Sequence, residues 1–330
     1  MTPTIIPVDD ASRVSEVRRA ALAIARAEGL NEPLSGNVAL VSTEICTNLH
    51  KYARGGEVFL TPLSGRNGPG IEILAIDRGP GMNDIRRCFT DGYSSGNSAG
   101  TGLGAIKRLS REFDIFSEPG RGTVMVSRIR GDGSGGALVG GIVKPVAGEN
   151  VSGDAWAFRE GDGTVVLIAA DGLGHGIDAA RASAEAIRAF RNASDLTPLP
   201  LLQQVHDALR GTRGAAVAVA HIQVADRRVR YAGIGNISGV IPRAEKPIFM
   251  ISHSGTAGYQ SPRFQEFAYS LAEGAMVIMH SDGLNTNWRL NTYPGLRRCH
   301  PSVIAGVLYR DASRERDDVT VIAVKLPEPS

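Results

Sequence analysis

Glu44 and Asn48 are polar residues one helical turn apart, and their side chains could bind a metal ion and move a proton. Apolar residues at three- to four-residue spacing predict a helix over 35–52 and put this pair on one face of it. An asparagine oxygen suits Mg²⁺, and a glutamate one turn earlier could act as a base toward a hydroxyl group. Taken alone, the pair is more typical of an ordinary polar helix face.

Asp77 ends the apolar run 71–76 and opens a Gly-Pro-Gly turn that contains Gly79 and Gly81. Its carboxylate is therefore expected at a strand end, where it could accept a hydrogen bond from the exocyclic amine of adenine. Because glycine has no side chain, the two glycines would let the backbone approach the base closely.

A run of alternating glycines, Gly100, Gly102 and Gly104, precedes a helix expected over 102–110. Bare backbone N–H groups at a helix N-terminus form an anion site for phosphate. The small polar residues before this run are typical of a mobile lid, and Thr123 lies beyond it after a further glycine. Together with the two preceding segments, this order predicts a site for ATP and Mg²⁺. Lys51 and Lys107 could also contact phosphate, although solvated surface positions are at least as compatible with the sequence.

A second set of acidic residues, after position 150, suits a pair of divalent metal ions. Each member ends or opens an apolar run, although an Asp-Gly pair alone is more typical of a β-turn. Hard oxygen ligands from separate strands favour Mn²⁺ or Mg²⁺ over Zn²⁺. Two such ions can clamp a phosphoryl group and lower the pKa of a bound water. The candidate ligands are Asp154, Asp171, the carbonyl of Gly172, Asp282 and Asp317.

Residues 131–141 contain six glycines and are predicted to form a flexible linker between domains 1–130 and 142–330. Before the linker, helices are expected over 11–28, 35–52 and 102–110, with strands over 57–62, 71–76, 112–117 and 123–130. After it, helices are expected over 177–192, 198–209 and 301–311, with strands over 154–159, 164–170, 215–224, 228–234, 275–280 and 319–324.

The composition is that of a globular protein of 330 residues with a net charge of +2, which gives no reason to expect nucleic acid or an anionic membrane as partner. No apolar run is long enough to span a bilayer, and the first ten residues lack the features of a signal peptide. Three widely spaced cysteines favour reduced thiols. A cytoplasmic location is therefore expected.

The first 130 residues resemble the GHKL ATPase family in their Glu-xxx-Asn, Asp-x-Gly-x-Gly and Gly-x-Gly-x-Gly segments. Within that family they are most similar to the RsbT-type switch kinases, relatives of the RsbW and SpoIIAB anti-sigma-factor kinases. The resemblance implies a Bergerat-type α/β sandwich in which Asn48 binds Mg²⁺, Glu44 is the base, Asp77 reads adenine, and Gly102 and Gly104 close over phosphate.

Residues 142–327 resemble the type 2C serine/threonine phosphatases of the SpoIIE branch, and the RsbX type most of all. The resemblance rests on Ser-Gly-Asp, Ala-Asp-Gly-Leu-Gly-His-Gly, His-Ser-Asp-Gly-Leu and Asp-Asp-Val-Thr, in this order. It implies a central β-sandwich flanked by helices, with Asp154 and the catalytic Asp171 bridging two Mn²⁺ or Mg²⁺ ions. Asp318 is the alternative to Asp317 as ligand. His175 would either touch phosphate or be an ordinary loop histidine.

The two resemblances together imply a bifunctional partner-switching enzyme of a stressosome or sigma-factor pathway in a bacterial stress response. Its N-terminal domain would phosphorylate serine or threonine on a STAS-domain antagonist or scaffold, and its C-terminal domain would remove that phosphate. Two alternatives stay open: a phosphatase with an ATP-sensing regulatory domain, and a module that binds a sigma factor or another partner. An RsbT-like role would also include contact with a downstream phosphatase or cyclase.

Overall fold

The computed structural model describes residues 3–64, 68–85, 87–89, 102–131, 133, 137–161, 163–243, 245–259 and 264–326. The chain divides into two compact units, and each unit is formed by segments that are separate in the sequence. The N-terminal unit comprises Thr2–Gly136 together with Gly295–Arg310. The C-terminal unit comprises Ala137–Pro294 together with Asp311–Ser330.

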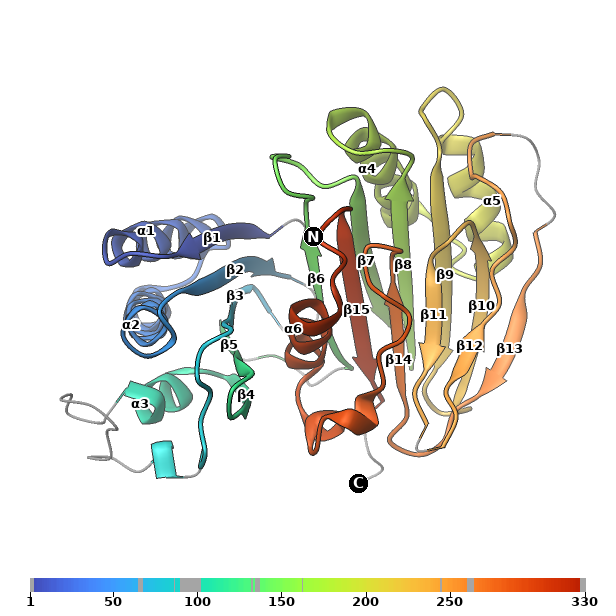
Figure 1. Ribbon diagram of the computed structural model, residues 1–330. Helices are drawn as coiled ribbons and strands as arrows, with labels where there is room; N and C mark the ends of the chain where they lie inside the picture. Colours follow the sequence, from blue (N-terminus) through green and yellow to red (C-terminus); the bar gives the residue numbers. More distant parts are fainter. Residues whose placement is uncertain are drawn as a thin grey trace. The chain divides into compact units, whose positions relative to one another are not determined.

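The N-terminal unit is built on an antiparallel sheet of five strands in the order β1-β2-β3-β5-β4. Its strands are β1 (Thr4–Val8), β2 (Gly56–Leu63), β3 (Gly70–Ile76), β4 (Glu112–Glu118) and β5 (Gly122–Arg130). Three helices pack on one face of the sheet (Figure 1): α1 (Ser12–Ala27), α2 (Glu32–Asn48) and α3 (Gly102–Leu109). Val17, Ile45 and Ile106 from these helices share one buried core with Ile73 and Ile129 of the sheet. Short turns at Leu49–Ala53 (π-helical) and Arg87–Phe89 (3₁₀) complete this part.

The opposite face of the same sheet is covered by α6 (Pro301–Ala312), which comes from the far end of the chain. A Cβ atom at Gly306 would lie 2.7 Å from Cγ1 of Val124 and 3.4 Å from Cδ1 of Ile76, so the helix crosses the sheet closely. Tyr309 packs edge-on against Phe59, with ring centroids 5.8 Å apart. The N-terminal unit therefore has three layers, and the third follows a short 3₁₀ turn at Leu296–Arg298.

The C-terminal unit is a sandwich of two five-stranded sheets, ordered β13-β10-β9-β8-β7 and β12-β11-β14-β15-β6. Trp156 and Leu167 of the first sheet and Ile322 of the second meet in one buried core. Helices α4 (Ile177–Asn192) and α5 (Pro198–Ala208) cover the outer face of the first sheet through a second core. The strands are β6 (Leu138–Lys144), β7 (Asp154–Gly161), β8 (Thr164–Gly172), β9 (Ala215–Gln223), β10 (Arg228–Ile234), β11 (Ser238–Ile241), β12 (Ile248–Met250), β13 (Phe267–Ser270), β14 (Met276–His280) and β15 (Val319–Lys325), with a 3₁₀ turn at Leu290–Thr292.

The glycine-rich segment predicted as a linker overlaps a strand, because β6 begins at Leu138 and pairs along its length with β15. A Cβ atom at Gly141 would lie 2.8 Å from Cζ2 of Trp156 and 2.8 Å from the carbonyl oxygen of Val321. This glycine therefore makes room for the indole ring. Composition could not distinguish such a packing role from flexibility.

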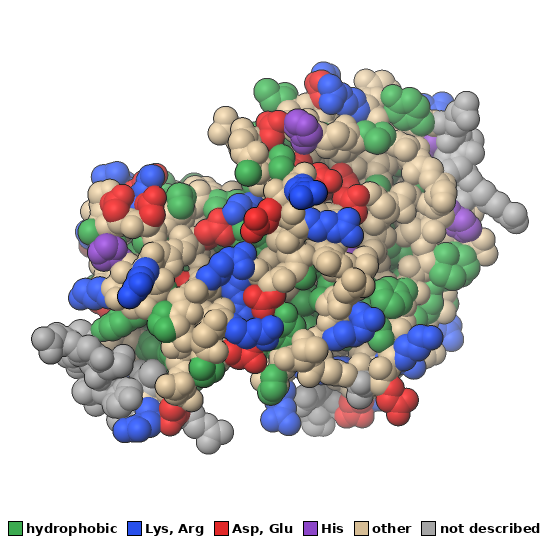
Figure 2. All heavy atoms as spheres, viewed as in Figure 1, with side chains coloured by type: hydrophobic (Ala, Val, Ile, Leu, Met, Phe, Trp, Pro, Cys, Tyr) green, Lys and Arg blue, Asp and Glu red, His purple; other side chains and the backbone are tan. Residues whose placement is uncertain are grey.

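The surface carries both signs of charge. Basic and acidic side chains lie interspersed over the face drawn in Figure 2. Among the described residues, none of the helices combines the length and apolar character that crossing a membrane requires.

Candidate functional site

Glu44 and Asn48 lie half-buried in the last turns of α2, before the π-helical turn Leu49–Ala53. The helix starts at a polar cap, because the side chain of Asn31 accepts a hydrogen bond from the N–H of Leu34 at 3.0 Å. A side chain at Gly102 would begin 3.0 Å from Oε2 of Glu44 and 3.9 Å from the amide of Asn48. The structure thus brings the start of α3 next to both polar groups of α2.

Asp77 follows β3 directly and is only 8% exposed. Its Oδ1 accepts hydrogen bonds from the N–H of Gly79 at 2.8 Å and of Thr123 at 3.1 Å. Burial raises the pKa of this carboxyl, while the two backbone N–H groups and the nearby charge of Arg310 act in the opposite direction. Both bonds engage Oδ1, so Oδ2 is the oxygen that can accept from the amine of a bound base.

The glycines around Asp77 are needed by the turn itself. A Cβ atom at Gly81 (φ +68°) would overlap the carbonyl oxygen of Glu118, and one at Gly122 (φ +86°) would overlap the carbonyl oxygen of Asp77. A Cβ atom at Gly79 would lie 2.7 Å from Cα of Ala53. The turn that follows β3 is therefore in direct backbone contact with the end of β4 and the start of β5.

Thr123 supports this turn through its backbone and its hydroxyl. Its N–H bonds Asp77, and its hydroxyl lies 2.9 Å from that of Ser117. Gly102 and Gly104 lie in the first turn of α3, whereas the predicted Gly100 is outside the described residues. Nζ of Lys107 lies 5.2 Å from the ring centroid of Phe89, a cation–π contact. The paired hard-oxygen groups, the free carboxylate oxygen and the bare start of α3 suit an adenine nucleotide with a magnesium ion.

Asp154 and Asp171 face each other as directly paired residues of β7 and β8. Desolvation, followed by the nearby carboxylates of Asp282 and Asp317, raises the pKa of Asp171 to about 7. Asp154 is buried at 4% exposure, and its pKa is raised by desolvation and by the charge of Asp171. The structure therefore brings together carboxyl groups whose ionised forms repel one another and would be stabilised by a divalent cation.

One carboxylate oxygen of this cluster has no hydrogen-bond partner among the residues that the structure describes. Oδ2 of Asp154 accepts a hydrogen bond from the hydroxyl of Ser281 at 2.6 Å, while the buried Oδ1 has none. Oδ2 of Asp282 accepts from the side-chain amide of Asn236 at 2.7 Å. As positioned, no three histidine, cysteine, aspartate or glutamate side chains of the described residues stand close enough together to hold an ion. An all-oxygen donor set with an orphaned buried oxygen nevertheless fits Mg²⁺ or Mn²⁺ chemically.

Asp317 and Asp318 have different environments. Both carboxylate oxygens of Asp318 accept backbone N–H groups, from Val146 at 2.7 Å and from Gly153 at 2.6 Å, and the residue is 3% exposed. Asp317 is exposed, and burial and neighbouring carboxylates raise its pKa. This geometry favours Asp317 as the ligand and gives Asp318 a structural role.

Three further residues belong to this region. Ser281 precedes Asp282 in the His-Ser-Asp-Gly-Leu segment, so its position was visible in the sequence. Asn236 and Glu149 carried no such signal, because only the fold brings them near. Glu149 bonds Nδ1 of His175 at 2.7 Å. Gly172 packs tightly, because a Cβ atom there would overlap the carbonyl oxygen of Ala179.

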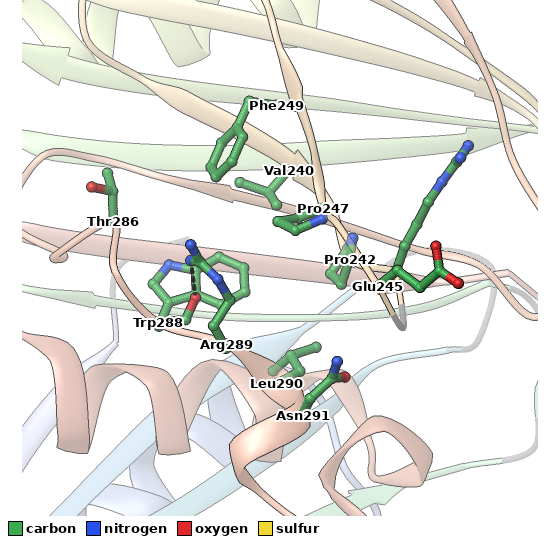
Figure 3. A pocket seen from close by; sticks show the side chains of 11 residues that line it. Val240, Pro242, Glu245, Pro247, Phe249, Thr286, Trp288, Arg289, Leu290 and Asn291 are labelled. Atoms are coloured by element: carbon green, nitrogen blue, oxygen red, sulfur yellow. Dashed lines mark hydrogen bonds between the residues drawn. The ribbon is translucent and has the colours of Figure 1, made fainter.

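A surface pocket of the C-terminal unit lies elsewhere, between β11, β12 and the segment 286–291 (Figure 3). It is lined by Phe249, Pro242 and Trp288, among others, and the guanidinium of Arg289 donates to the carbonyl of Trp288 at 2.8 Å. None of the predicted site residues lines it.

Two family models match the chain. Residues 161–327 match Stage II sporulation protein E (SpoIIE), and residues 6–128 match the histidine kinase-like ATPase domain.

Individual relatives match each part. Serine/threonine-protein kinase RsbT of Bacillus subtilis is 33% identical over 100 residues, covering 30% of this chain and 75% of RsbT. Phosphoserine phosphatase RsbX of the same organism is 24% identical over 140 residues, covering 42% of this chain and 70% of RsbX.

A solved structure described as the bacterial stressosome, a modular system adapted to control secondary messenger signaling, is 30% identical with a TM-score of 0.53. The match covers 58% of this chain and 100% of that one. The expected fold class, a kinase-like ATPase domain followed by a type 2C phosphatase domain, is confirmed. The chain thus belongs to the SpoIIE family and carries at its N-terminus a histidine kinase-like ATPase domain of the RsbT family.

Proposed function

We propose that this chain phosphorylates and dephosphorylates serine or threonine on STAS-domain proteins, as both arms of one partner switch. The observation that carries the proposal is that two chemically opposed sites occur in one chain. The N-terminal unit brings Glu44, Asn48 and Gly102 together, and the C-terminal unit clusters Asp154 and Asp171.

In the proposed kinase reaction, Asp77 binds the adenine amine through its Oδ2. Asn48 would hold the magnesium ion that accompanies the triphosphate, and Glu44 would accept the proton of the attacking hydroxyl. The N–H groups at the start of α3 bind phosphate oxygens.

In the proposed phosphatase reaction, Asp154, Asp171, Asp282, Asp317 and the carbonyl of Gly172 would hold two Mn²⁺ or Mg²⁺ ions. When bound, such ions would supply a water of lowered pKa and neutralise the phosphoryl oxygens. Ser281 and Asn236 orient two of these carboxylates by hydrogen bonds. Asp318 fixes the backbone around Gly153, next to Asp154.

The relatives support the choice of substrate. RsbT is a serine/threonine-protein kinase, RsbX is a phosphoserine phosphatase, and a stressosome structure is similar to this chain. A phosphate adds roughly 1.5 to 2 negative charges, which can make or break a contact between proteins.

The test uses the purified chain, a STAS-domain protein encoded beside it, and labelled ATP with Mg²⁺, followed by Mn²⁺. We expect label on the STAS protein that Asn48→Ala prevents. We expect its subsequent loss to require Mn²⁺ and to be absent in Asp171→Asn.

Two other outcomes would replace the proposal. Mn²⁺-dependent release of phosphate without any labelling would identify a phosphatase with an ATP-sensing domain. Binding of the partner that persists in Asn48→Ala, with neither reaction, would identify a sequestering module.

A further inference from the structure

Helix α6 belongs to the N-terminal unit up to Arg310, although in the sequence it lies between metal-ligand candidates of the C-terminal unit. Asp282 precedes it in the sequence and Asp317 follows it. The chain enters the N-terminal unit at Gly295 and leaves it after Arg310. One continuous helix therefore connects the sheet of the nucleotide-binding unit to the segment that carries Asp317.

The first turn of α6 is bound to that sheet by a buried ion pair. Arg128 of β5, 6% exposed, donates through Nε to Oε2 of Glu72 on β3 at 2.7 Å. Its Nη2 donates to the hydroxyl of Ser302 at 3.2 Å, and that hydroxyl donates to the same Glu72 oxygen at 2.6 Å. A serine of α6 thus completes a charge pair that is almost inaccessible to water.

His300 caps the helix and fixes its register. Its Nδ1 accepts the N–H of Ser302 at 3.1 Å, so Nε2 carries the proton and faces Oε2 of Glu112 at 3.3 Å. Its own N–H donates to Oδ2 of Asp114 at 2.5 Å. Burial and the neighbouring guanidinium of Arg128 lower the pKa of His300 to about 3, which keeps it neutral. These directional contacts define one docked position of the helix.

The last turn of α6 reaches the nucleotide site. The hydroxyl of Tyr309 donates to Oε2 of Glu57 at 2.7 Å. Arg310 is 2% exposed, its carbonyl accepts a hydrogen bond from Arg78, and its charge acts on the carboxylate of Asp77. The residue that follows the adenine-reading aspartate is therefore tied to the end of the helix.

Beyond Arg310 the chain is tied to the segment that follows Asp282. The N–H of Asn285 donates to the carbonyl of Ala312 at 2.9 Å, and the N–H of Arg314 donates to the carbonyl of Gly283 at 2.9 Å. A Cβ atom at Gly283 would overlap the carbonyl oxygen of Asp318, so this segment also packs against the strand entry next to Asp317. The contacts of α6 within the N-terminal unit and those of Ala312 and Arg314 within the C-terminal unit therefore lie on one continuous stretch of chain, next to the residues that flank Asp282 and Asp317.

We propose that α6 is a shared element through which adenine nucleotide binding and divalent metal binding stabilise each other. A base held by Asp77 favours the docked position of Arg310, and the docked helix fixes the segments that carry Asp282 and Asp317. Arg310 acts as a positioning residue for the nucleotide. The inference rests on the proposed function for its assignment of the metal ligands. Linkage requires the effect to be reciprocal.

The test measures Mn²⁺ affinity of the full chain from the free Mn²⁺ EPR signal, with and without saturating adenosine. Adenosine lacks the phosphates that would bind the metal themselves. We expect adenosine to tighten Mn²⁺ binding about fivefold or more, the lower end of typical coupling. The double variant Ser302→Ala/Tyr309→Phe, which changes neither site, should lose most of this coupling. Tyr269→Phe, which removes a hydroxyl that bonds the N–H of Ile251 in the C-terminal unit, should retain it.

Adenosine binding tests the role of Arg310 separately. Arg310→Met should weaken adenosine binding about tenfold at neutral pH and shift its pH dependence upward, since one pKa unit corresponds to a factor of ten. Arg310→Lys, which keeps the charge, should restore both. Equal effects of the two variants at every pH would assign Arg310 a purely structural role and overturn that part of the proposal.

The remaining outcomes distinguish failure of the proposed sites from failure of the coupling between them. Mn²⁺ binding that Asp171→Asn does not weaken would refute the proposed metal site, and the coupling with it. Failure of adenosine to bind would overturn the role given to Asp77 and Arg310. Both ligands binding at their assigned sites with independent affinities would sink the coupling alone and leave the proposed function standing.

Discussion

Among the candidate metal ligands, Asp171 is the residue whose protonation we expect to control metal binding most directly. Its pKa lies near 7 because of burial and the carboxylates of Asp282 and Asp317. A metal ligand must be deprotonated, so below that pH an incoming ion has to displace a proton. We expect Mn²⁺ affinity to rise by about tenfold or more between pH 6 and pH 8 and to level off above it. Calorimetric titration at several pH values measures this.

Two neighbouring variants control that experiment. Asp317→Asn should weaken Mn²⁺ binding with little change in stability. Asp318→Asn should lower the free energy of unfolding, because both oxygens of Asp318 accept buried backbone N–H groups. The reverse pattern would reassign the ligand to Asp318. A flat pH profile would mean that Asp171 is already ionised at pH 6.

The sequence predicted which acidic residues are candidates for the metal site, but not which of them bind metal and which have a structural role. Apolar runs that begin at Asp154 or end before Asp171 and Asp282 predicted these three residues, because strand ends are where such residues project from a sheet. The adjacent pair Asp317 and Asp318 could not be separated, since only the position of Gly153 determines which side chain turns inward. These ligand roles remain predictions.

Among the elements, α6 is preceded by a buried histidine that stays neutral. The ordinary pKa of histidine is about 6.5, whereas burial holds that of His300 near 3. Between these values the unfolded chain binds a proton that the folded chain does not, so stability falls as pH decreases below about 6.5. His300→Gln removes this term. Urea unfolding at pH 7.5 and pH 5.5 should show the stability advantage of the wild type over the variant shrink by about 1.4 kcal/mol at the lower pH.

Comparing wild type and variant removes the contribution of the aspartates, whose raised pKa values act in the opposite direction and are common to both proteins. An advantage that is the same at both pH values would show that folding does not lower the pKa of His300.

Periodicity predicted the long elements well and the short ones poorly. The helical spacing around Ile45 and the apolar runs of β8 and β15 gave those elements to within a few residues. The strands β11, β12 and β13 have three or four residues each, which is too few for an alternation of apolar and polar side chains to be recognised. β1 was missed because it contains Pro7, and β6 because of its glycines.

The placement of α6 lay beyond any local signal. Its residues from Pro301 to Arg310 are all buried, so no polar stripe marks a solvent side. Its partners Glu72, Arg128 and Glu112 lie more than 170 positions away in the sequence. Such pairing is set by tertiary structure alone.

For the whole molecule, we expect the passage of the chain from one unit to the other and back to couple the stabilities of the two units. Both tryptophans, Trp156 and Trp288, lie in the C-terminal unit and report on its unfolding. Arg128→Met removes the guanidinium that pairs with the buried Glu72 in the N-terminal unit, and breaking a buried ion pair typically costs about 3–5 kcal/mol. Because undocking α6 releases both ends of the segment 295–310, we expect the tryptophan transition to move to lower urea as well.

Arg121→Met is the matched control, because Arg121 pairs with Glu118 at the surface of the same unit and such pairs contribute at most about 1 kcal/mol. It should leave the tryptophan transition in place. If Arg128→Met instead separated the curves, with circular dichroism reporting an early transition and tryptophan fluorescence an unchanged one, the two units would be independent folding units. A single shifted transition in both signals would mean that α6 joins them into one cooperative structure, which is the mechanical condition for one site to sense the other.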